Sequence, residues 1–252
     1  MAKPVYIYGI HSIDHLLQTQ PQAIIHLYLD KARGDKRVQS IVDSAQALAV
    51  KIDWQSRQQL DEWTEHQQHQ GCVAEVRLPK PGGERELDQV LDRALDAQTV
   101  TPPLLLLLDQ VQDPHNLGAC LRSAEAAGVT AVIAPRDNSA PLNATVFKSS
   151  AGAALRVPFF QVTNLARTQQ YLQQRGIWLV GTAAEAEQTL YQLDLRGPIA
   201  LVLGSEGKGM RRLVQEHCDF LARLPMFGHV SSLNVSVSAG ICLYEVLRQR
   251  GL

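Results

Sequence analysis

Apolar and polar positions in the first 78 residues alternate in a way that predicts short strands separated by helices. Apolar clusters of strand length occur at residues 24–29, 52–54 and 72–78. Between the first two clusters, apolar residues recur with helical spacing over residues 38–48. An earlier helix is expected after a turn at Gly9. This alternation predicts a small α/β sandwich in the N-terminal part of the chain.

The pattern changes at Leu104, where a continuous apolar run through Leu108 is typical of a strand buried in a parallel sheet. A polar loop and a helix rich in small residues follow, ending at Gly128. Further strands are expected at residues 129–134, 157–160, 177–182 and 199–204, and a further helix at residues 165–174. The C-terminal part therefore predicts a doubly wound parallel α/β sheet.

Proline and glycine residues mark a boundary between the two parts. They cluster at residues 79–83, and proline recurs at Pro102 and Pro103. The acidic stretch between these two signals favours a helix over part of its length. We therefore expect an N-terminal domain over residues 1–78, a linker over residues 79–100 and a C-terminal domain over residues 101–252.

The last long apolar stretch fits either a strand or a helix. Leu233, Val235 and Val237 alternate as in a strand, whereas positions 233, 237, 241, 244 and 247 lie on one helical face. The length of the stretch and the basic residues before Gly251 favour a helix, with Asn234 as its N-cap. Small residues near the start of this helix suit the close approach of another backbone or a ligand.

Composition limits the possible functions only loosely. The 252 residues carry a formal net charge of −1, so an RNA partner would have to bind through local basic patches. The four cysteines form no CxxC pair and are expected to be reduced thiols that pack in the interior. Neither a signal peptide nor a membrane-spanning apolar run is evident, and we expect a soluble cytoplasmic protein.

One basic patch lies in a turn-rich connection between predicted elements. It consists of Lys31, Arg33, Lys36 and Arg37. A solvated loop explains these residues as well as a contact with RNA phosphates does. Phosphate contacts would add affinity without sequence preference.

The spacing of His66, His69 and Cys72 raises the possibility of a metal site. No fourth ligand is apparent in the sequence, and a structural zinc site needs four. We therefore expect no metal at these residues.

Polar residues after two of the C-terminal strands are candidate site residues, because ligands gather at the carboxyl ends of parallel strands. Asn116 and Arg122 follow the first strand, and another strand ends at Gly204, two residues before Glu206. The glycine-rich stretch 203–210 matches neither the P-loop nor the GxGxxG pattern. Glu206 is costly there unless it is solvated or paired, and we hypothesise an ion pair with Arg122.

Three stretches resemble, in order, the signature motifs of the SpoU (TrmH-type) RNA ribose 2′-O-methyltransferase family, within the knotted SPOUT superfamily. They are residues 109–122, 201–210 and 224–241. Residues 8–11 and 69–71 are also similar to the substrate-binding domain of the branch that methylates a guanosine of 23S rRNA. The resemblance thus extends over most of the chain.

The resemblance implies an N-terminal L30e-like domain that binds RNA, a C-terminal α/β domain with a deep trefoil knot, S-adenosylmethionine as cofactor, and a homodimer. It implies that methyl transfer depends on Asn116, Arg122, Glu206, Ser232 and Asn234. By the same resemblance, the cofactor would be held largely by backbone groups of Gly204, Leu224 and Leu233.

The role of Arg122 needs a chemical argument, because arginine is a poor general base with a pKa above about 12. We expect Arg122 to clamp the target phosphate and to stabilise the developing alkoxide. Asn116, Ser232 and Glu206 would position it. Asn234 would shape the loop of the third motif by capping, and in SpoU dimers Arg122 would serve the partner's site.

One position departs from the family pattern and leaves the substrate open. Leu155 stands where the family usually carries a glutamate. One alternative is a tRNA ribose 2′-O-methyltransferase of the same family, and the N-terminal domain favours rRNA over it. The other is a non-catalytic RNA-binding or ribosome-assembly factor, against which the intact polar motif residues argue.

Overall fold

A computed structural model describes residues 5–96 and 101–252, and contacts divide them into two compact units. The first unit comprises the chain up to Lys80 together with Leu142–Leu155. The second unit comprises Pro81–Pro141 and Arg156–Leu252. A segment from the middle of the chain therefore belongs to the N-terminal unit, so the chain crosses between the units three times.

The first unit is a four-stranded sheet with helices on both faces. Its elements are β1 (Val5–Tyr8), α1 (Ile10–Thr19), β2 (Ile24–Asp30), α2 (Lys36–Ala47), β3 (Ile52–Gln55), α3 (Arg57–Trp63), β4 (Cys72–Val76) and α6 (Ala144–Ser149). The strand order is β1-β4-β2-β3, with β2 and β3 parallel and the β4 pairs antiparallel. The predicted small α/β sandwich is confirmed.

Apolar side chains of α1 and α2 pack against one face of this sheet and form its core. On the other face, Trp63 of α3 stacks on Tyr6 with ring centroids 5.3 Å apart and also contacts Tyr28. Phe147 of α6 joins the main core at 3% exposure, and Lys148 lies 5.0 Å from the ring centroid of Tyr8. The middle segment of the chain is thus built into the first unit.

The second unit is a seven-stranded sheet in the order β7-β6-β5-β10-β8-β11-β9, and its strand pairs are parallel. Its strands are β5 (Leu104–Asp109), β6 (Ala131–Pro135), β7 (Phe159–Val162), β8 (Trp178–Thr182), β9 (Gln188–Thr189), β10 (Ile199–Gly204) and β11 (Phe220–Arg223). Its helices are α4 (Glu84–Ala94), α5 (Pro114–Ala126), α7 (Leu165–Gln174), α8 (Arg212–Glu216) and α9 (Val235–Gln249). The predicted doubly wound parallel sheet is confirmed.

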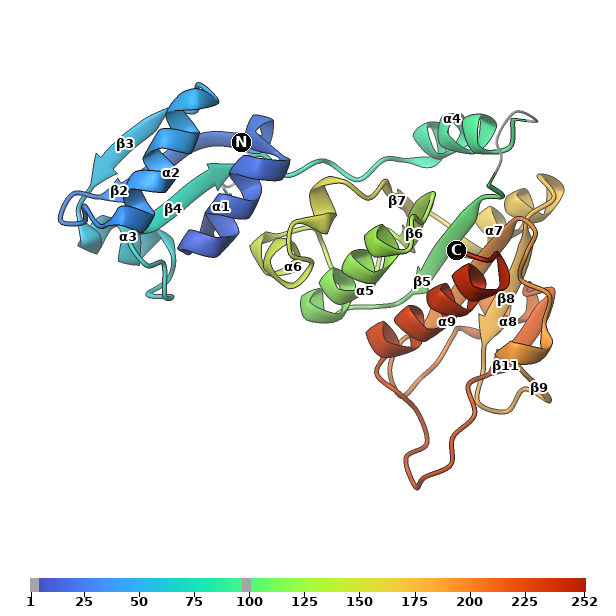
Figure 1. Cartoon of the computed structure of the whole chain (residues 1–252). Coiled ribbons are helices and arrows are strands. Elements are labelled where there is room, and N and C mark those ends of the chain that lie inside the picture. Colours follow the sequence, from blue (N-terminus) through green and yellow to red (C-terminus); the bar gives the residue numbers. More distant parts are fainter. Residues whose placement is uncertain (1–4, 97–100) are drawn as a thin grey trace. The chain divides into compact units, whose positions relative to one another are not determined.

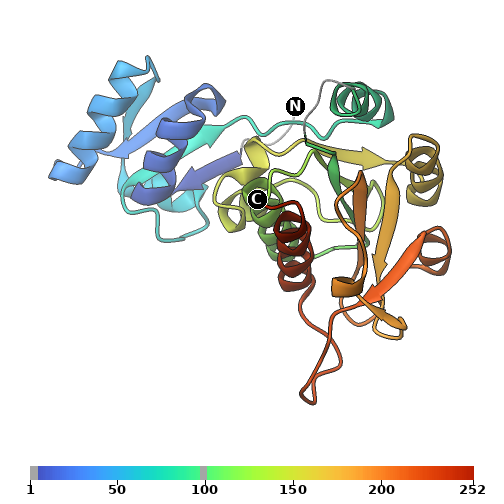
Figure 2. The ribbon, with the colours of Figure 1, turned by 45° about the vertical axis from the view of Figure 1, so that its right-hand side comes forward.

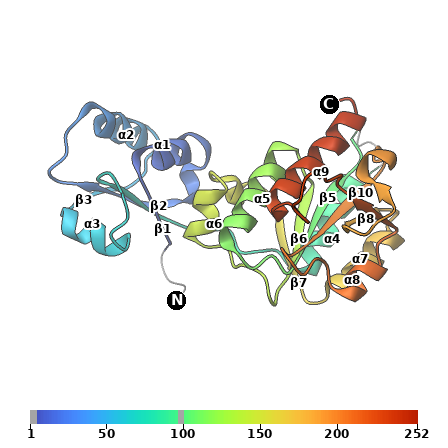
Figure 3. The ribbon, with the colours of Figure 1, turned by 90° about the horizontal axis from the view of Figure 1, so that it is seen from below.

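Helices cover both faces of this sheet because its central strands are apolar on both sides. Side chains of α4, α7 and α8 share one core cluster with Leu105 and Leu107 of β5. Alternate residues of a strand point to opposite faces, and α9 packs against β10 and against α5. Figures 2 and 3 show α5 and α9 side by side. Helix α4 lies within the predicted linker, and its Leu87 and Leu91 are buried in the core cluster.

One predicted strand is shifted in the structure, and the predicted N-cap of the C-terminal helix is present. The strand expected at residues 157–160 lies at Phe159–Val162, because Pro158 has no backbone N–H for the sheet. The C-terminal helix is confirmed, and the side chain of Asn234 caps it by accepting from the N–H of Ser236 at 2.9 Å. The alternating apolar pattern at its start reflects a helix whose first turns are only partly covered.

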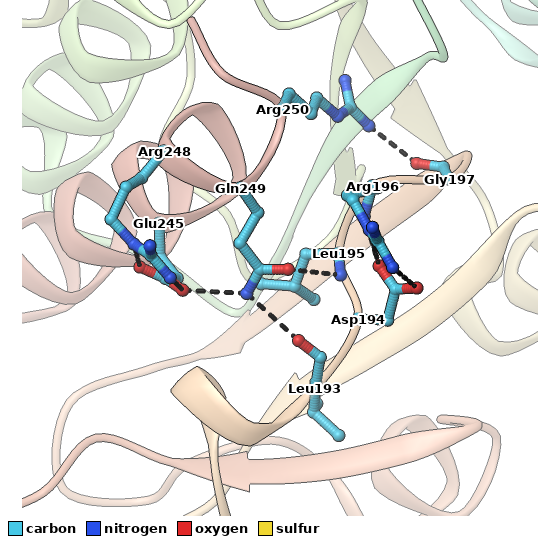
Figure 4. A network of polar contacts seen from close by, with 9 residues as sticks. All are labelled: Leu193, Asp194, Leu195, Arg196, Gly197, Glu245, Arg248, Gln249 and Arg250. Carbon is cyan, nitrogen blue, oxygen red and sulfur yellow. Dashed lines mark hydrogen bonds and ion pairs between the residues drawn. The ribbon is translucent and has the colours of Figure 1, made fainter.

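A network of polar contacts anchors the far end of α9 (Figure 4). Arg250 donates to the carbonyl oxygens of Pro102 and Gly197, both at 2.7 Å. Gln249 donates to the carbonyl of Leu193 at 3.1 Å and accepts from the N–H of Leu195 at 2.9 Å. The C-terminal end of α9 is therefore held by backbone groups from two separate segments.

Burial and sulfur chemistry agree with the expected packing role of the cysteines. All four are free thiols, and three of them are buried. Burial raises the pKa of the Cys120 and Cys242 thiols to about 12, which leaves them protonated. Across residues 5–96 and 101–252, no helix combines the length and apolar character needed to cross a membrane.

Candidate active site

A cavity of about 650 Å³ lies at the carboxyl edge of the second unit's sheet. Its walls are the segments that follow β8, β10 and β11, together with the start of α9. These segments meet because parallel strands end at the same edge of a sheet. The segment after β10 is the glycine-rich loop (residues 204–210), and the segment after β11 is the third-motif loop (residues 224–234), which protrudes in Figures 1 and 2.

The glycine-rich loop turns back tightly over its own first residue. Ser205 and Gly209 exchange two backbone hydrogen bonds, of 3.1 and 2.9 Å, which close the loop. A Cβ atom at Gly204 would lie 2.0 Å from the carbonyl carbon of Gly209, so only glycine fits where the chain crosses itself. Gly207 and Gly209 have positive φ angles of 75° and 66°. The loop is therefore a tight turn with a fixed shape.

Three polar residues from the three motifs meet beside this cavity and form the site cluster: Asn116, Glu206 and Asn234. The Nδ2 atom of Asn116 donates to Oε1 of Glu206 at 3.1 Å. The Nδ2 atom of Asn234 donates to Oδ1 of Asn116 at 2.9 Å and also to Oε1 of Glu206. The first helical N–H of α9, that of Val235, donates to the same oxygen at 3.3 Å. Residues separated by up to 118 positions thus form one hydrogen-bonded group.

The hypothesised ion pair between Glu206 and Arg122 is wrong. Glu206 is satisfied by the two asparagines and a helix N-terminus, all through Oε1. Arg122 lies on the exposed side of α5 and forms no ion pair with any residue that the structure describes. The site cluster therefore forms without an ion pair to Arg122.

The remaining predicted site residues lie along the cavity. Gly204, Leu224, Ser232 and Leu233 all line it. Ser232 is exposed, and the two leucines are only partly buried. The side chains of Ser232, Leu224 and Leu233 therefore lie outside the buried core of the second unit.

The predicted basic connection, here called the basic loop (residues 31–37), ends in a helix, because Asp35 caps α2 and Lys36 and Arg37 form the first turn of that helix. Its basic side chains are of two kinds. Lys31, Lys36 and Arg37 are exposed, and none of them forms an ion pair with another described residue. Arg33 instead donates through Nε to Asp35 at 2.8 Å and through Nη1 to the carbonyl of Gln70. Arg33 therefore ties the basic loop to a turn far along the chain.

That turn contains His69, one of the residues weighed as a metal ligand. The His69 side chain is buried, and its Nδ1 accepts from the N–H of Gly71 at 3.0 Å. Its Nε2 lies 2.9 Å from Oδ1 of Asp61, to which it donates in the corresponding tautomer. Both ring nitrogens are used, so His69 stabilises the turn.

The side chain of Gln70 extends this turn to the start of α1. Its Oε1 accepts from the N–H of Ile10 at 3.1 Å, which caps a helix whose own N-cap, Gly9, has no side chain. The two N-terminal stretches of the family resemblance therefore meet in space.

Leu155, the departure from the family pattern, packs against the core of the first unit. An apolar residue suits that position. Its neighbour Arg156 pairs with Glu125 at 2.8 Å within the second unit.

Sequence reasoning missed one charged pair next to the glycine-rich loop. Asp109, the last residue of β5, is fully buried and pairs with Arg211 at 2.7 Å. An aspartate at the end of an otherwise all-leucine strand was a usable signal, because a buried carboxylate requires a partner. Nothing local identified Arg211 as that partner.

Comparison with known proteins extends these observations to the whole chain. The family model described as SpoU rRNA Methylase family matches residues 103–244, and the model for RNA 2′-O ribose methyltransferase substrate binding matches residues 6–82. The 23S rRNA (guanosine-2′-O-)-methyltransferase RlmB of Pseudomonas aeruginosa is 57% identical over 244 residues, which cover 97% of this chain and 96% of that protein.

Two solved structures show the same fold. The crystal structure of an RNA 2′-O ribose methyltransferase matches with a TM-score of 0.75 and 28% identity, over 99% of this chain and 90% of that one. The SpoU methyltransferase AviRb from Streptomyces viridochromogenes, in complex with AdoMet, matches with a TM-score of 0.76 and 23% identity, over 98% and 90% of the two chains. The chain therefore belongs to the SpoU rRNA methylase family.

Proposed function

We propose that this protein transfers a methyl group from S-adenosylmethionine to the ribose 2′-hydroxyl of a guanosine in 23S rRNA. The closeness to RlmB over nearly the whole chain supports this substrate. The observation that carries the proposal is the site cluster, in which the three motifs meet at the edge of a cavity. We assign the reaction to the cytoplasm, because ribosomal RNA is the proposed substrate.

The cavity fits a cofactor of this kind. Its volume of about 650 Å³ lies within the range of small-molecule sites, roughly 300–1,000 Å³. Gly204, Leu224 and Leu233 line it from three different segments, so their backbone groups are the proposed contacts. When bound, the cofactor supplies an activated sulfonium methyl group.

The residues of this chain have to align the nucleophile and assist the loss of its proton. Within the described chain, the hydrogen bonds of Glu206 all end on Oε1, which leaves Oε2 for the target ribose or an ordered water. Asn234 is saturated by its bonds to the other two members and to Ser236, which supports a structural role for it. Asn116 and Ser232 are the proposed positioning groups.

Arg122 is the proposed clamp for the target phosphate. It is exposed and follows Asn116 on α5. A guanidinium remains charged at neutral pH and matches phosphate geometry with its fork of donors. We therefore assign Arg122 to the stabilisation of charge that develops on the ribose oxygen.

We propose that two copies of the chain form a homodimer through α9. Val237 and Tyr244 are 49% and 55% exposed and lie two turns apart on one face, with Gly240 and Ile241 between them. An apolar stripe on an otherwise packed helix is typical of an interface. Helix α5 packs beside α9, and Ser123, the neighbour of Arg122, approaches Gly240 in this stripe, so we propose that Arg122 serves the partner's site.

RNA binding falls to the first unit in this proposal. The exposed Lys31, Lys36 and Arg37 would contact phosphates, whereas Arg33 maintains the loop that presents them. The match of residues 6–82 to the substrate-binding model supports this assignment.

The experiment that tests the function is transfer of tritiated methyl from S-adenosylmethionine to unmodified 23S rRNA and to tRNA. Label in 23S rRNA alone, mapped to the ribose of a guanosine and absent in Asn116→Ala, is the expected result. Label in tRNA alone would move the protein to the tRNA branch of the family. No label in either RNA, with the cofactor still bound, would indicate a binding protein without turnover.

A further inference from the structure

We propose that Asp109 and Arg211 form a clamp that holds the glycine-rich loop closed, and thereby positions Glu206 and one wall of the cofactor cavity. This inference rests on the proposed function for its catalytic meaning. The two residues would be positioning residues, since neither belongs to the site cluster.

Arg211 occupies both carboxylate oxygens of Asp109. Oδ2 of Asp109 accepts from the backbone N–H of Arg211 at 2.8 Å. Oδ1 accepts from Nε at 2.8 Å and lies 2.7 Å from Nη2. Both carboxylate oxygens of a fully buried residue are thus used by one arginine. The charge-assisted bonds from the guanidinium to Oδ1 and the backbone bond to Oδ2 together fix the orientation of the carboxylate.

The position of the pair in the chain explains what it restrains. Asp109 ends β5 and is directly opposite Gly204, the last residue of the neighbouring strand β10. Arg211 is the first residue after the glycine-rich loop and the N-cap of α8. The loop therefore begins in the sheet at Gly204 and is returned to the same sheet by the bond to Asp109.

Glu206 lies at the middle of this restrained loop. Its carboxylate has to reach donors from α5 and from the start of α9 at the same time. Backbone bonds between Ser205 and Gly209 close the loop, but they do not orient it relative to β5. The clamp supplies this orientation, because it ties the end of the loop to Asp109 at the end of β5. The short connection after Asp109 leads to α5, which carries Asn116.

The energetics favour a positioning role. Asp109 is fully buried, so removal of the Arg211 side chain leaves a buried carboxylate without its charged partner and disturbs the structure around it. A displacement of about 1 Å at a catalytic group can cost on the order of 100-fold in rate. Loss of the clamp therefore has to appear as a local effect on the loop, beyond any change in global stability.

The test compares Asp109→Asn, Arg211→Ala and Arg211→Lys with Arg212→Ala as the matched control. Arg212 is adjacent in sequence, but its side chain is 84% exposed and forms an ion pair with Glu216, one helical turn along α8. The first readout is amide hydrogen exchange at Ser205 and Gly209 in the protein without cofactor. We expect exchange to rise about 10-fold or more in Asp109→Asn and Arg211→Ala, and to stay within about twofold in Arg212→Ala.

The second readout is the Kd of S-adenosylmethionine by calorimetry, together with KM and kcat. Asp109→Asn and Arg211→Ala should weaken binding about 10-fold and also lower kcat, because both the cavity wall and Glu206 move. Arg211→Lys keeps the backbone bond and one charged donor, so it should recover part of the loss. Leu91→Ala, a core variant with a lowered Tm, should leave the Kd unchanged below its melting range and so separates positioning from stability.

The double variant Asp109→Asn with Arg211→Ala should exchange no faster than the worse single variant, because the two residues act as one unit. Unchanged loop exchange in the single variants, or fully additive effects in the double variant, would overturn the clamp. Faster exchange with an unchanged Kd and kcat would overturn its role in the site. A wild-type protein that does not bind the cofactor would contradict the proposed function, and the exchange data would still decide whether the clamp holds the loop.

Discussion

The glycine-rich loop and the basic loop present charged residues in opposite ways. Glu206 in the glycine-rich loop is held by donors from two helices, and the loop is anchored at both ends. In the basic loop, Arg33 is held by Asp35, whereas the basic side chains of Lys31, Lys36 and Arg37 are exposed. The first arrangement suits chemistry that depends on atomic position. The second suits long-range attraction to phosphates, which tolerates movement.

The largest expected effect concerns the catalytic site, where activity depends on atomic position. Asn116→Ala and Arg122→Ala should each reduce methyl transfer by on the order of 100-fold, because each removes a group that positions or stabilises the reacting oxygen. If Arg122 serves the partner's site, co-expression of an Asn116→Ala chain with an Arg122→Ala chain should recover roughly a quarter of wild-type activity. The reason is that about half of the dimers are then mixed, and each mixed dimer contains one complete site and one defective site. Recovery of nothing in verified mixed dimers would place Arg122 in the site of its own chain.

The next prediction concerns the segment that joins the first unit from the middle of the chain. Phe147→Ala should lower the stability of the first unit by about 3 kcal/mol, because it empties a buried position in that unit's core. Hydrogen exchange at β1 and β4 measures the change. Lys148→Ala is the neighbouring control and should cost about 0.5 kcal/mol, since it loses only a contact over Tyr8. Equal effects of the two variants would mean that α6 only rests on the surface of the unit.

The counterpart in the exposed basic loop is a smaller effect on RNA affinity. Replacement of Lys31, Lys36 and Arg37 by glutamine should raise the Kd for RNA about 10-fold. It should also make the dependence of log Kd on log salt concentration less steep, by an amount that corresponds to the loss of roughly two to three phosphate contacts. The kcat should stay unchanged. Arg33→Gln is the control, because it loses the bonds to Asp35 and Gln70 and should disturb the loop while retaining most of the salt dependence. An unchanged salt dependence in the triple variant would leave these residues as a solvated loop.

The smallest predicted effect is pH dependence at the anchored end of α9. Hydrogen bonds from Arg248, and also from Gln249, hold the pKa of Glu245 below its ordinary value of 4.5. A lowered pKa in the folded state adds stability above the unfolded pKa, and this stability is lost as the pH falls through the folded pKa. Because Arg248 is largely solvated, the contribution is about 1 kcal/mol. Glu245→Gln should therefore be less stable than wild type at neutral pH, with a difference that shrinks in acid, as measured by denaturant unfolding across pH 2–7.

Several features of this protein were accessible from its sequence. Continuous apolar runs such as residues 104–108 predicted a buried parallel sheet, because only strands covered on both faces tolerate them. Asn234 was predicted as an N-cap, since capping depends on neighbouring backbone groups. The three polar motifs carried the family resemblance, which the comparisons confirm.

Contacts between distant residues were decided by the tertiary structure. The partner of Glu206 was predicted to be Arg122, but two asparagines and a helix N-terminus satisfy it, because polar groups pair with whatever the fold brings within reach. Local pattern likewise could not assign Phe147 to the core of the first unit, since helical spacing indicates that a face is buried and not what covers it. The sequence by itself determined which elements form and which polar residues stand at their ends. Only the tertiary structure decided which of those residues meet, because that depends on the packing of segments more than a hundred positions apart.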